Sequence, residues 1–176
     1  MTVEIRRADA RDAALLHELA AATFPLACPP DTAPEAIEAF IRDNLSVESF
    51  VDYLADDARE LFLASVDGVG AGYTMLVHAE PGDPDVAAVV TAHPTAELSK
   101  VYVLAGHHGS GVAGQLVQAT VEAARSRGAV SVWLGVNQHN AKANRFYEKQ
   151  GFVQVGTKRF LVGDRWEDDF VRTLEL

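Results

Sequence analysis

Apolar residues recur along the first half of the chain with two spacings. Alternation of apolar and polar residues, together with short runs of β-branched types, predicts strands over residues 2–7, 61–66 and 71–78. Apolar residues three and four positions apart predict helices over residues 9–24, 35–45 and 46–55. Asp67-Gly68 indicates a hairpin turn between the second and third strands. Residues 79–94 are rich in proline and are expected to form a surface excursion, with its mobility left open.

The second half alternates strands with helices. Strand character at residues 97–104 gives way to glycines and histidines at 106–109, and helical spacing resumes at Val112. A nearly all-apolar strand is predicted next, then a helix, then a closing hairpin, over residues 130–136, 140–150, 152–162 and 169–176. This order predicts a mixed sheet in one α/β (α+β) domain covering residues 1–176.

The turn at residues 106–114 is the strongest local signal in the chain. A strand that enters a helix through glycines leaves unpaired backbone N–H groups at the positive end of that helix, which suits a phosphate or pyrophosphate. No Lys-Ser/Thr pair follows, so the turn is not a P-loop. Residues 109–114 do spell G-x-G-x-x-G, but residues 131–133, about 20 positions on, are Ser, Val and Trp rather than acidic. A dinucleotide fold is therefore disfavoured.

Composition narrows the class of protein. The formal charge of −10 argues against a nucleic-acid partner, and 48% hydrophobic residues in a chain of 176 allow one substantial core. No apolar run approaches the ~20 residues that span a bilayer, and no leader precedes the first strand, so no membrane association is expected. Cys28 is the single cysteine, which fits a cytoplasmic protein without disulfides.

Two sequence motifs resemble those of one enzyme superfamily. The run from His108 to Ala113 resembles the Q/R-x-x-G-x-G/A signature of the GNAT superfamily of N-acetyltransferases, with His108 in place of the usual Gln or Arg. The run from Asn140 to Phe152 resembles the N-x-x-A-x-x-F-Y-x-x-x-G-F motif that follows the next strand in the same superfamily. Because both motifs occur in the right order, the chain is identified as a member.

This resemblance implies a fold, a cosubstrate and a set of contacts. The fold would be a mostly antiparallel sheet with a central, splayed parallel strand pair and flanking helices. The cosubstrate would be acetyl-CoA, with its pyrophosphate on the glycine turn and its pantetheine arm in the gap between the two parallel strands. The implied contacts are Val101, Val103, His108, Gly109, Ser110, Gly111, Val112, Ala113, Gly114, Asn140 and Tyr147.

Acetyl transfer requires that the amine lose a proton and that the CoA sulfur depart, and one residue is assigned to each step. An alkylammonium has a pKa near 10.4, so only about one molecule in a thousand is a free amine at pH 7. By resemblance, Glu97 would act as the base, directly or through water, and Tyr147 would hydrogen-bond the departing sulfur. The alternatives are that Glu97 faces solvent and that Tyr147 packs against the sheet. His107, His108 and His139 show no metal-site spacing and are expected to be solvated loop residues.

The acceptor is the least determined part of the prediction. Features at residues 22–24, 133–136 and 155–164 resemble bacterial spermidine/spermine acetyltransferases, which implies a small-molecule amine, in particular a polyamine. The acidic residues Asp164, Glu167, Asp168 and Asp169 are expected to be a solvated face, with attraction of a cationic acceptor as the alternative. A non-catalytic acyl-CoA-binding sensor of the same fold is the second hypothesis for function. The sequence also leaves a homodimer open.

Overall fold

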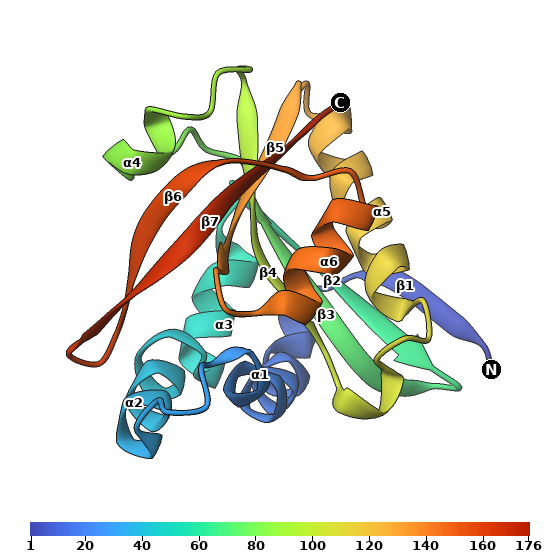
Figure 1. The fold of residues 1–176 in the computed structure, drawn as a ribbon. Coiled ribbons are helices and arrows are strands. Elements are labelled where there is room, and N and C mark those ends of the chain that lie inside the picture. The colour runs from blue at the N-terminus through green and yellow to red at the C-terminus, as the bar shows by residue number, and fades with distance from the viewer.

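A single sheet of seven strands runs through the molecule (Figure 1). The computed structural model describes all 176 residues. In spatial order the strands are β1 (Val3–Arg7), β2 (Arg59–Val66), β3 (Val69–Val77), β4 (Thr95–Val103), β5 (Ser131–Asn137), β7 (Arg165–Glu175) and β6 (Val153–Val162). Only β4 and β5 pair in parallel, and all other neighbours are antiparallel. The predicted mixed, mostly antiparallel sheet is confirmed.

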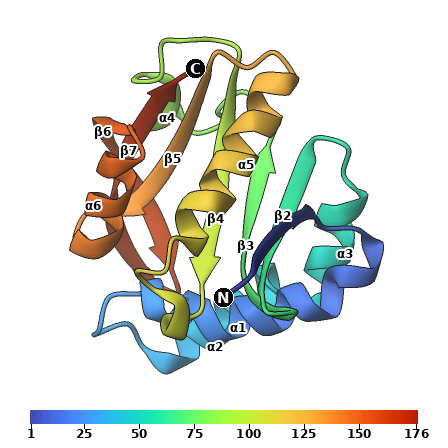
Figure 2. The same cartoon turned by 90° about the vertical axis from the view of Figure 1, so that its right-hand side faces the viewer.

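Helices cover both faces of this sheet. They are α1 (Ala13–Ala27), α2 (Pro34–Asn44), α3 (Val47–Ala55), α4 (Pro84–Ala87), α5 (Val112–Ser126) and α6 (Ala141–Lys149). Leu63 of β2 packs with α1 and α3, whereas the next residue, Ala64, packs with α5 on the opposite face, as strand alternation requires. Figure 2 shows α5 in front of the strands and α1 and α2 along the bottom of the view. No helix is both long and apolar enough to cross a membrane.

The segment before β4 is more ordered than its prolines suggested. Residues 84–87 form the short helix α4, and Val86 and Val90, four positions apart, are buried against Trp133 and Val171. The surface excursion is therefore anchored to the sheet by a small apolar cluster of its own. The prolines obscured this spacing, because Pro84 begins the helix rather than ending it.

The closing hairpin is longer than the sequence indicated. Strand β7 begins at Arg165, four residues before the predicted start at Asp169. Four of its first five residues are charged, so this stretch had the composition of a turn or a solvated face. Because strand side chains alternate, Glu167 and Asp169 share one face of β7, while Asp168 faces outward and is exposed.

The two parallel strands separate soon after they begin to pair. They are joined only where residues Thr95 to Glu97 lie opposite Ser131 to Trp133. Beyond that point β4 stays with β3, and β5 stays with β7 as far as the pair Asn137 and Asp169. The implied splay is confirmed. A bulge at Ser99 also interrupts the register of β4, so that Leu98 lies opposite Leu76 and Lys100 opposite Met75.

Candidate active site

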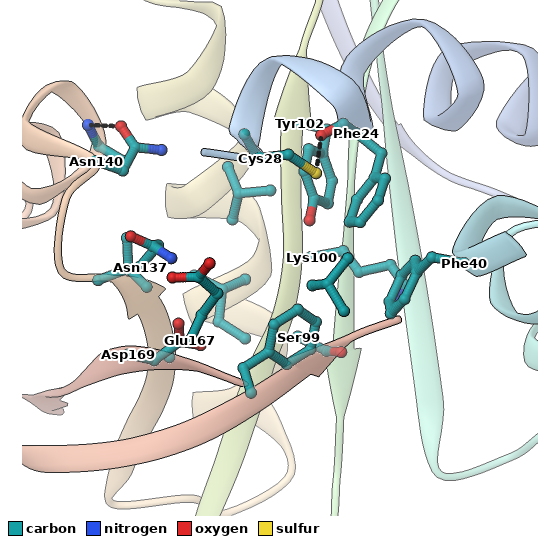
Figure 3. A pocket seen from close by; sticks show the side chains of 18 of the residues that line it. Phe24, Cys28, Phe40, Ser99, Lys100, Tyr102, Asn137, Asn140, Glu167 and Asp169 are labelled. Carbon is teal, nitrogen blue, oxygen red and sulfur yellow. Dashed lines mark hydrogen bonds between the residues drawn. The ribbon is translucent and has the colours of Figure 1, made fainter. Parts of the chain in front are cut away.

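Two cavities meet where β4 and β5 diverge. The first, of about 360 Å³, lies between β4, the glycine turn and α6. The second, of about 240 Å³, lies among β4, β7 and the end of α1 (Figure 3). Both are lined by Ala27, Val101, Tyr102, Asn140, Ala143 and Tyr147. We call the first the cofactor cleft and the second the acceptor cavity. Two molecules that entered them from opposite ends would meet beside Tyr147.

The glycine turn presents free backbone donors to the cofactor cleft. Gly109 and Gly111 have φ angles of 81° and 88°, a left-handed conformation that glycine adopts readily. The N–H groups of residues 111–114 have no backbone acceptor, and they lie at the start of the 15-residue helix α5. A Cβ added at either glycine would meet nothing within 4 Å. The free donors and the open space fit the pyrophosphate of acetyl-CoA.

The predicted cofactor residues divide into side-chain and main-chain positions. Val101, Val103, His108, Gly109, Gly111, Ala113, Gly114, Asn140 and Tyr147 line the cleft. Val112 is fully buried in the core below α5, and the Ser110 hydroxyl donates to the carbonyl of His107. These two residues are not in the cleft wall. Val112 can still offer its main-chain N–H to an anion, whereas the N–H of Ser110 already donates to the carbonyl of His107.

His108 is held in place rather than simply solvated. Its Nε2 lies 2.8 Å from the carbonyl oxygen of Val103, and its Nδ1 lies 2.7 Å from Nζ of Lys142. Lys142 can only donate, so Nδ1 accepts from it and Nε2 donates to the Val103 carbonyl. His108 is an exposed loop residue, as expected, but both of its ring nitrogens have partners. Its contacts fix the glycine turn to the end of β4 and bring the cation of Lys142 to the cofactor cleft.

Tyr147 projects from α6 to the junction of the two cavities. Its ring makes edge contacts with Phe146 and Phe152, with centroids 5.2 and 6.0 Å away. Burial raises the pKa of Tyr147 above its ordinary value, so the phenol is neutral and can donate a hydrogen bond. Tyr147 can therefore have both a packing role and a chemical role, because its ring contacts Phe146 and Phe152 while the residue also lines both cavities.

The turn between β5 and α6 is fixed by a buried polar network. Asn140 caps α6 by accepting from the N–H of Ala143 at 3.1 Å. Asn144 donates to the carbonyls of Asn137 and Asn140 and accepts from Nε of Arg172 at 2.9 Å. The side-chain oxygen of Asn140 is therefore occupied by its own helix, and its amide nitrogen remains for a ligand. Neither Asn144 nor Arg172 stood out in the sequence.

Glu97 lies in the acceptor cavity and not on a solvated strand edge. It is the last β4 residue paired with β5, and no hydrogen bond or ion pair engages its carboxylate. Burial raises the pKa of Glu97, although Lys158 and Lys100 oppose that shift. A raised pKa brings a carboxylate closer to the range in which it can exchange a proton near neutral pH.

The structure adds two lysines to the acceptor cavity that the sequence did not single out, Lys100 and Lys158, and it places two residues of the expected solvated acidic face, Glu167 and Asp169, in the cavity wall. Lys100 reaches the same cavity as Glu97 because the bulge at Ser99 offsets the strand alternation, and burial lowers its pKa to about 8. Lys158 lies 3.6 Å from Asp169, whose pKa burial raises to about 6. Glu167 lies in the same wall. Their spacing along the chain gives no common signal, because three strands contribute them.

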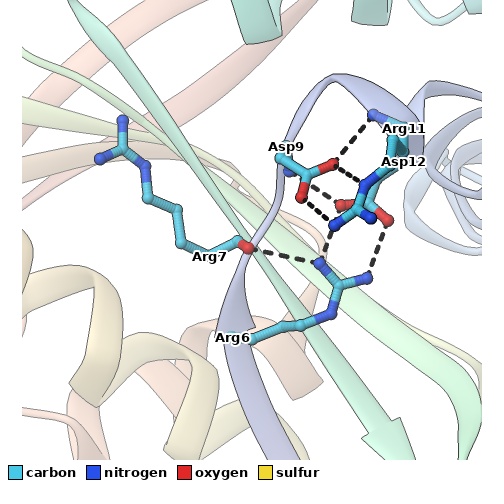
Figure 4. A network of polar contacts seen from close by, with 5 residues as sticks. All are labelled: Arg6, Arg7, Asp9, Arg11 and Asp12. Carbon is cyan, nitrogen blue, oxygen red and sulfur yellow. Dashed lines mark hydrogen bonds and ion pairs between the residues drawn. The ribbon is translucent and has the colours of Figure 1, made fainter.

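The end of α1 closes the acceptor cavity with Phe24, Ala27 and the C-cap residue Cys28. The beginning of the helix is fixed by a network in which Arg6 donates to both oxygens of Asp12 at 2.8 Å (Figure 4). Asp9 and Asp12 form a capping box on a short 3-10 turn, Ala10–Asp12, that leads directly into α1, so the predicted helix start is confirmed. Burial raises the pKa of the Cys28 thiol to about 11, which keeps it protonated and a poor nucleophile. No group of three His, Cys, Asp or Glu side chains is placed to bind a metal.

Comparisons with known proteins agree with this architecture. Residues 15–152 match the model of the acetyltransferase (GNAT) family. An uncharacterized N-acetyltransferase of Mycobacterium tuberculosis strain H37Rv is 46% identical over 165 residues, which cover 94% of this chain and 98% of that protein.

Two solved structures share the fold at low sequence identity. The PaiA N-acetyltransferase of Thermoplasma acidophilum, solved with coenzyme A, superimposes with a TM-score of 0.79 at 20% identity over all of both chains. An acetyltransferase of Salmonella typhimurium, solved with acetyl-CoA, gives 0.72 at 20% identity over 100% of this chain and 95% of that one. With the family match, the splayed strands and the open glycine turn, the chain belongs to the GNAT family of N-acetyltransferases and uses acetyl-CoA as its cosubstrate.

Proposed function

We propose that this enzyme transfers the acetyl group to a primary amine by direct attack within a ternary complex. The observation that carries the proposal is the meeting of two separate cavities at Tyr147. Acetyl-CoA supplies a thioester carbon for attack when it is bound in the cofactor cleft. A route from the opposite side lets the amine reach that carbon without an acetylated enzyme. The protonated thiol of Cys28 supports the same choice.

Glu97 is proposed to act as the general base, and Tyr147 as the hydrogen-bond donor to the departing sulfur. Glu97 accepts a proton from the incoming ammonium, directly or through water, which leaves the nitrogen lone pair free for attack. Tyr147 donates a hydrogen bond to the sulfur as the carbon–sulfur bond breaks. Free backbone N–H groups at the glycine turn hold the pyrophosphate, and main-chain groups of Val101 and Val103 line the pantetheine arm.

A polyamine is the proposed acceptor. Three carboxylates, those of Glu97, Glu167 and Asp169, line the acceptor cavity and favour a cation there. Two lysines in the same wall, Lys100 and Lys158, offset only part of this negative charge. Lys158 is paired with Asp169, and the lowered pKa of Lys100 leaves a fraction of its side chains neutral at neutral pH.

A thiol-release assay tests the proposal. The protein is incubated with acetyl-CoA and a panel of polyamines, monoamines, amino acids and an aminoglycoside, and free CoA is measured. Amine-dependent release is the expected result. If acetyl-CoA binds in calorimetry but no amine accelerates thiol release, the second hypothesis, a non-catalytic acyl-CoA-binding sensor, replaces this one.

A further inference from the structure

Glu167 has an unusual place in the acceptor cavity. It lies on β7, two residues beyond the last β5–β7 pair on the cavity side, Asn137 with Asp169. Figure 3 shows its carboxyl group pointing into the cavity, on the side where Asn137 lies. The side chain is 11% exposed, although it comes from a hairpin rich in exposed charged residues.

One oxygen of the Glu167 carboxylate receives no hydrogen bond from the protein. This oxygen, Oε1, is buried. Nε of Arg165 lies 3.2 Å away, within ion-pair distance, but makes no hydrogen bond with that oxygen. The other end of the same guanidinium is held at 2.7 Å by Asp31, on the loop that follows α1. A buried carboxylate oxygen without a donor is unfavourable, and a ligand that brings an N–H group would relieve this.

The chemistry of the reaction determines which nitrogen of the acceptor Glu167 can bind. A carboxylate stabilises the charged form of an ammonium beside it and so opposes loss of its proton. The nitrogen that is acetylated must lose that proton, whereas any other nitrogen of the acceptor can stay cationic. Asp169 and Glu167 each have a cation nearby, but Lys158 beside Asp169 is largely buried, whereas Arg165 beside Glu167 is half exposed and donates a hydrogen bond to Asp31 instead. Lys100 lies elsewhere in the cavity, with its Nζ 5.8 Å from the centre of the Tyr53 ring.

We infer that Glu167 is the specificity-determining residue for the acceptor, and that it binds a second ammonium group, one that is not acetylated. This inference rests on the proposed function, because it assumes that the cavity receives an amine. It narrows the acceptor class to amines with at least two cationic nitrogens. The first nitrogen faces the thioester, and the second donates a hydrogen bond to the Glu167 carboxylate, whose negative charge balances its own.

The chain provides a matched control for the test. Asp168 is the neighbour of Glu167 on β7, but it is exposed and does not line the cavity. Glu167→Gln and Asp168→Asn remove the same charge from the same strand. A general electrostatic attraction would weaken similarly in both variants, whereas a direct contact is lost only in the first.

The experiment compares 1,4-diaminobutane with butylamine, two probes of equal carbon length. Calorimetry with CoA-saturated protein measures binding without turnover, and thiol release measures kcat/KM. Glu167→Gln should weaken diamine binding and lower diamine kcat/KM by about tenfold or more, with butylamine changed less than about twofold and the Kd for acetyl-CoA unchanged. Asp168→Asn should change neither probe by more than about twofold.

Three results would overturn the inference. One is equal losses for the two probes, and another is equal losses in the two variants. The third is unchanged diamine binding in a Glu167→Gln protein whose melting curve shows it to be folded. If wild-type protein binds the diamine through Glu167 but releases no thiol, the proposed function fails while the contact stands. If it acetylates amines with no dependence on Glu167, only the contact fails.

Discussion

Glu97 of β4 and Trp133 of β5 are the last two residues that the parallel strands pair with one another. On one side of them lies a continuous sheet, and on the other the strands diverge and two cavities open. Backbone groups at a divergence lose their ladder partners and become available to a ligand. The same pair also places the carboxylate of Glu97 in the wall of the acceptor cavity, where burial raises its pKa.

The glycine turn should lose its ligand when its open space is filled with a negative charge. Gly111→Glu is expected to weaken acetyl-CoA binding at least about tenfold, because the carboxylate repels the pyrophosphate. Gly128→Glu is the control, since Gly128 also has a positive φ and open space but lies at the other end of α5. Calorimetric Kd values that match in the two folded variants would contradict this assignment.

The hydroxyl of Tyr147 should matter for turnover and not for affinity. Tyr147→Phe keeps the ring contacts with Phe146 and Phe152 and removes only the donor to the sulfur. We expect kcat to fall about tenfold to a hundredfold with the Kd for acetyl-CoA nearly unchanged. Tyr53→Phe removes a hydroxyl outside both cavities and should leave kcat as it was. An unchanged kcat with acetyl transfer rate-limiting would give Tyr147 a packing role alone.

The role of Glu97 as a base should be visible in the pH dependence of kcat/KM. A base is needed most where free amine is scarce, so Glu97→Gln should lower kcat/KM strongly near pH 7 and less near pH 9.5. Ser99→Ala alters the same cavity wall without removing a titrating group, and its loss should be independent of pH. The assignment fails if the Glu97→Gln loss is equally independent of pH.

The elements that sequence patterns located are those with local signals. Asp9 and Asp12 indicated the start of α1 because a capping box lies within four residues, and Asp67-Gly68 indicated its hairpin for the same reason. The glycine turn and the Asn140 motif placed the cofactor cleft, because its wall is built by two continuous stretches of chain. These parts could be predicted without the structure.

The acceptor cavity could not be predicted in this way. Its charged residues come from β4, β6 and β7, and whether they face it depends on a bulge and on the register of a hairpin. Lys100 and Glu97 are three residues apart, which an unbroken strand would place on opposite faces. Glu167 lay in a stretch whose charges resembled a solvated turn. Burial of such residues is a tertiary property, and no local pattern encodes it.

Asp169 should make stability depend on pH in a defined direction. Burial raises its pKa to about 6, so the folded protein holds this proton more tightly than the unfolded chain, where an aspartate titrates near 3.9. The stability it contributes is present below about pH 4 and is lost as the pH rises through about 6. Relative to wild type, Asp169→Asn should gain about 2 kcal/mol in unfolding free energy between pH 4 and pH 7. Denaturant titrations at both pH values measure this, and Asp168→Asn should show no such gain.

Salt should reveal whether the acidic cavity selects a polyamine. Spermidine and spermine carry several charges and gain from more than one carboxylate, so we expect a higher kcat/KM for them than for a monoamine. Screening shortens the range of these attractions from about 10 Å at 0.1 M salt to about 3 Å at 1 M. The advantage of the polyamines should therefore shrink between about 50 and 500 mM salt, while the monoamine rate changes less. A salt-independent preference would point to shape rather than charge. A preference for an amino acid, an aminoglycoside or a protein N-terminus would contradict the polyamine proposal and leave the acetyltransferase activity in place.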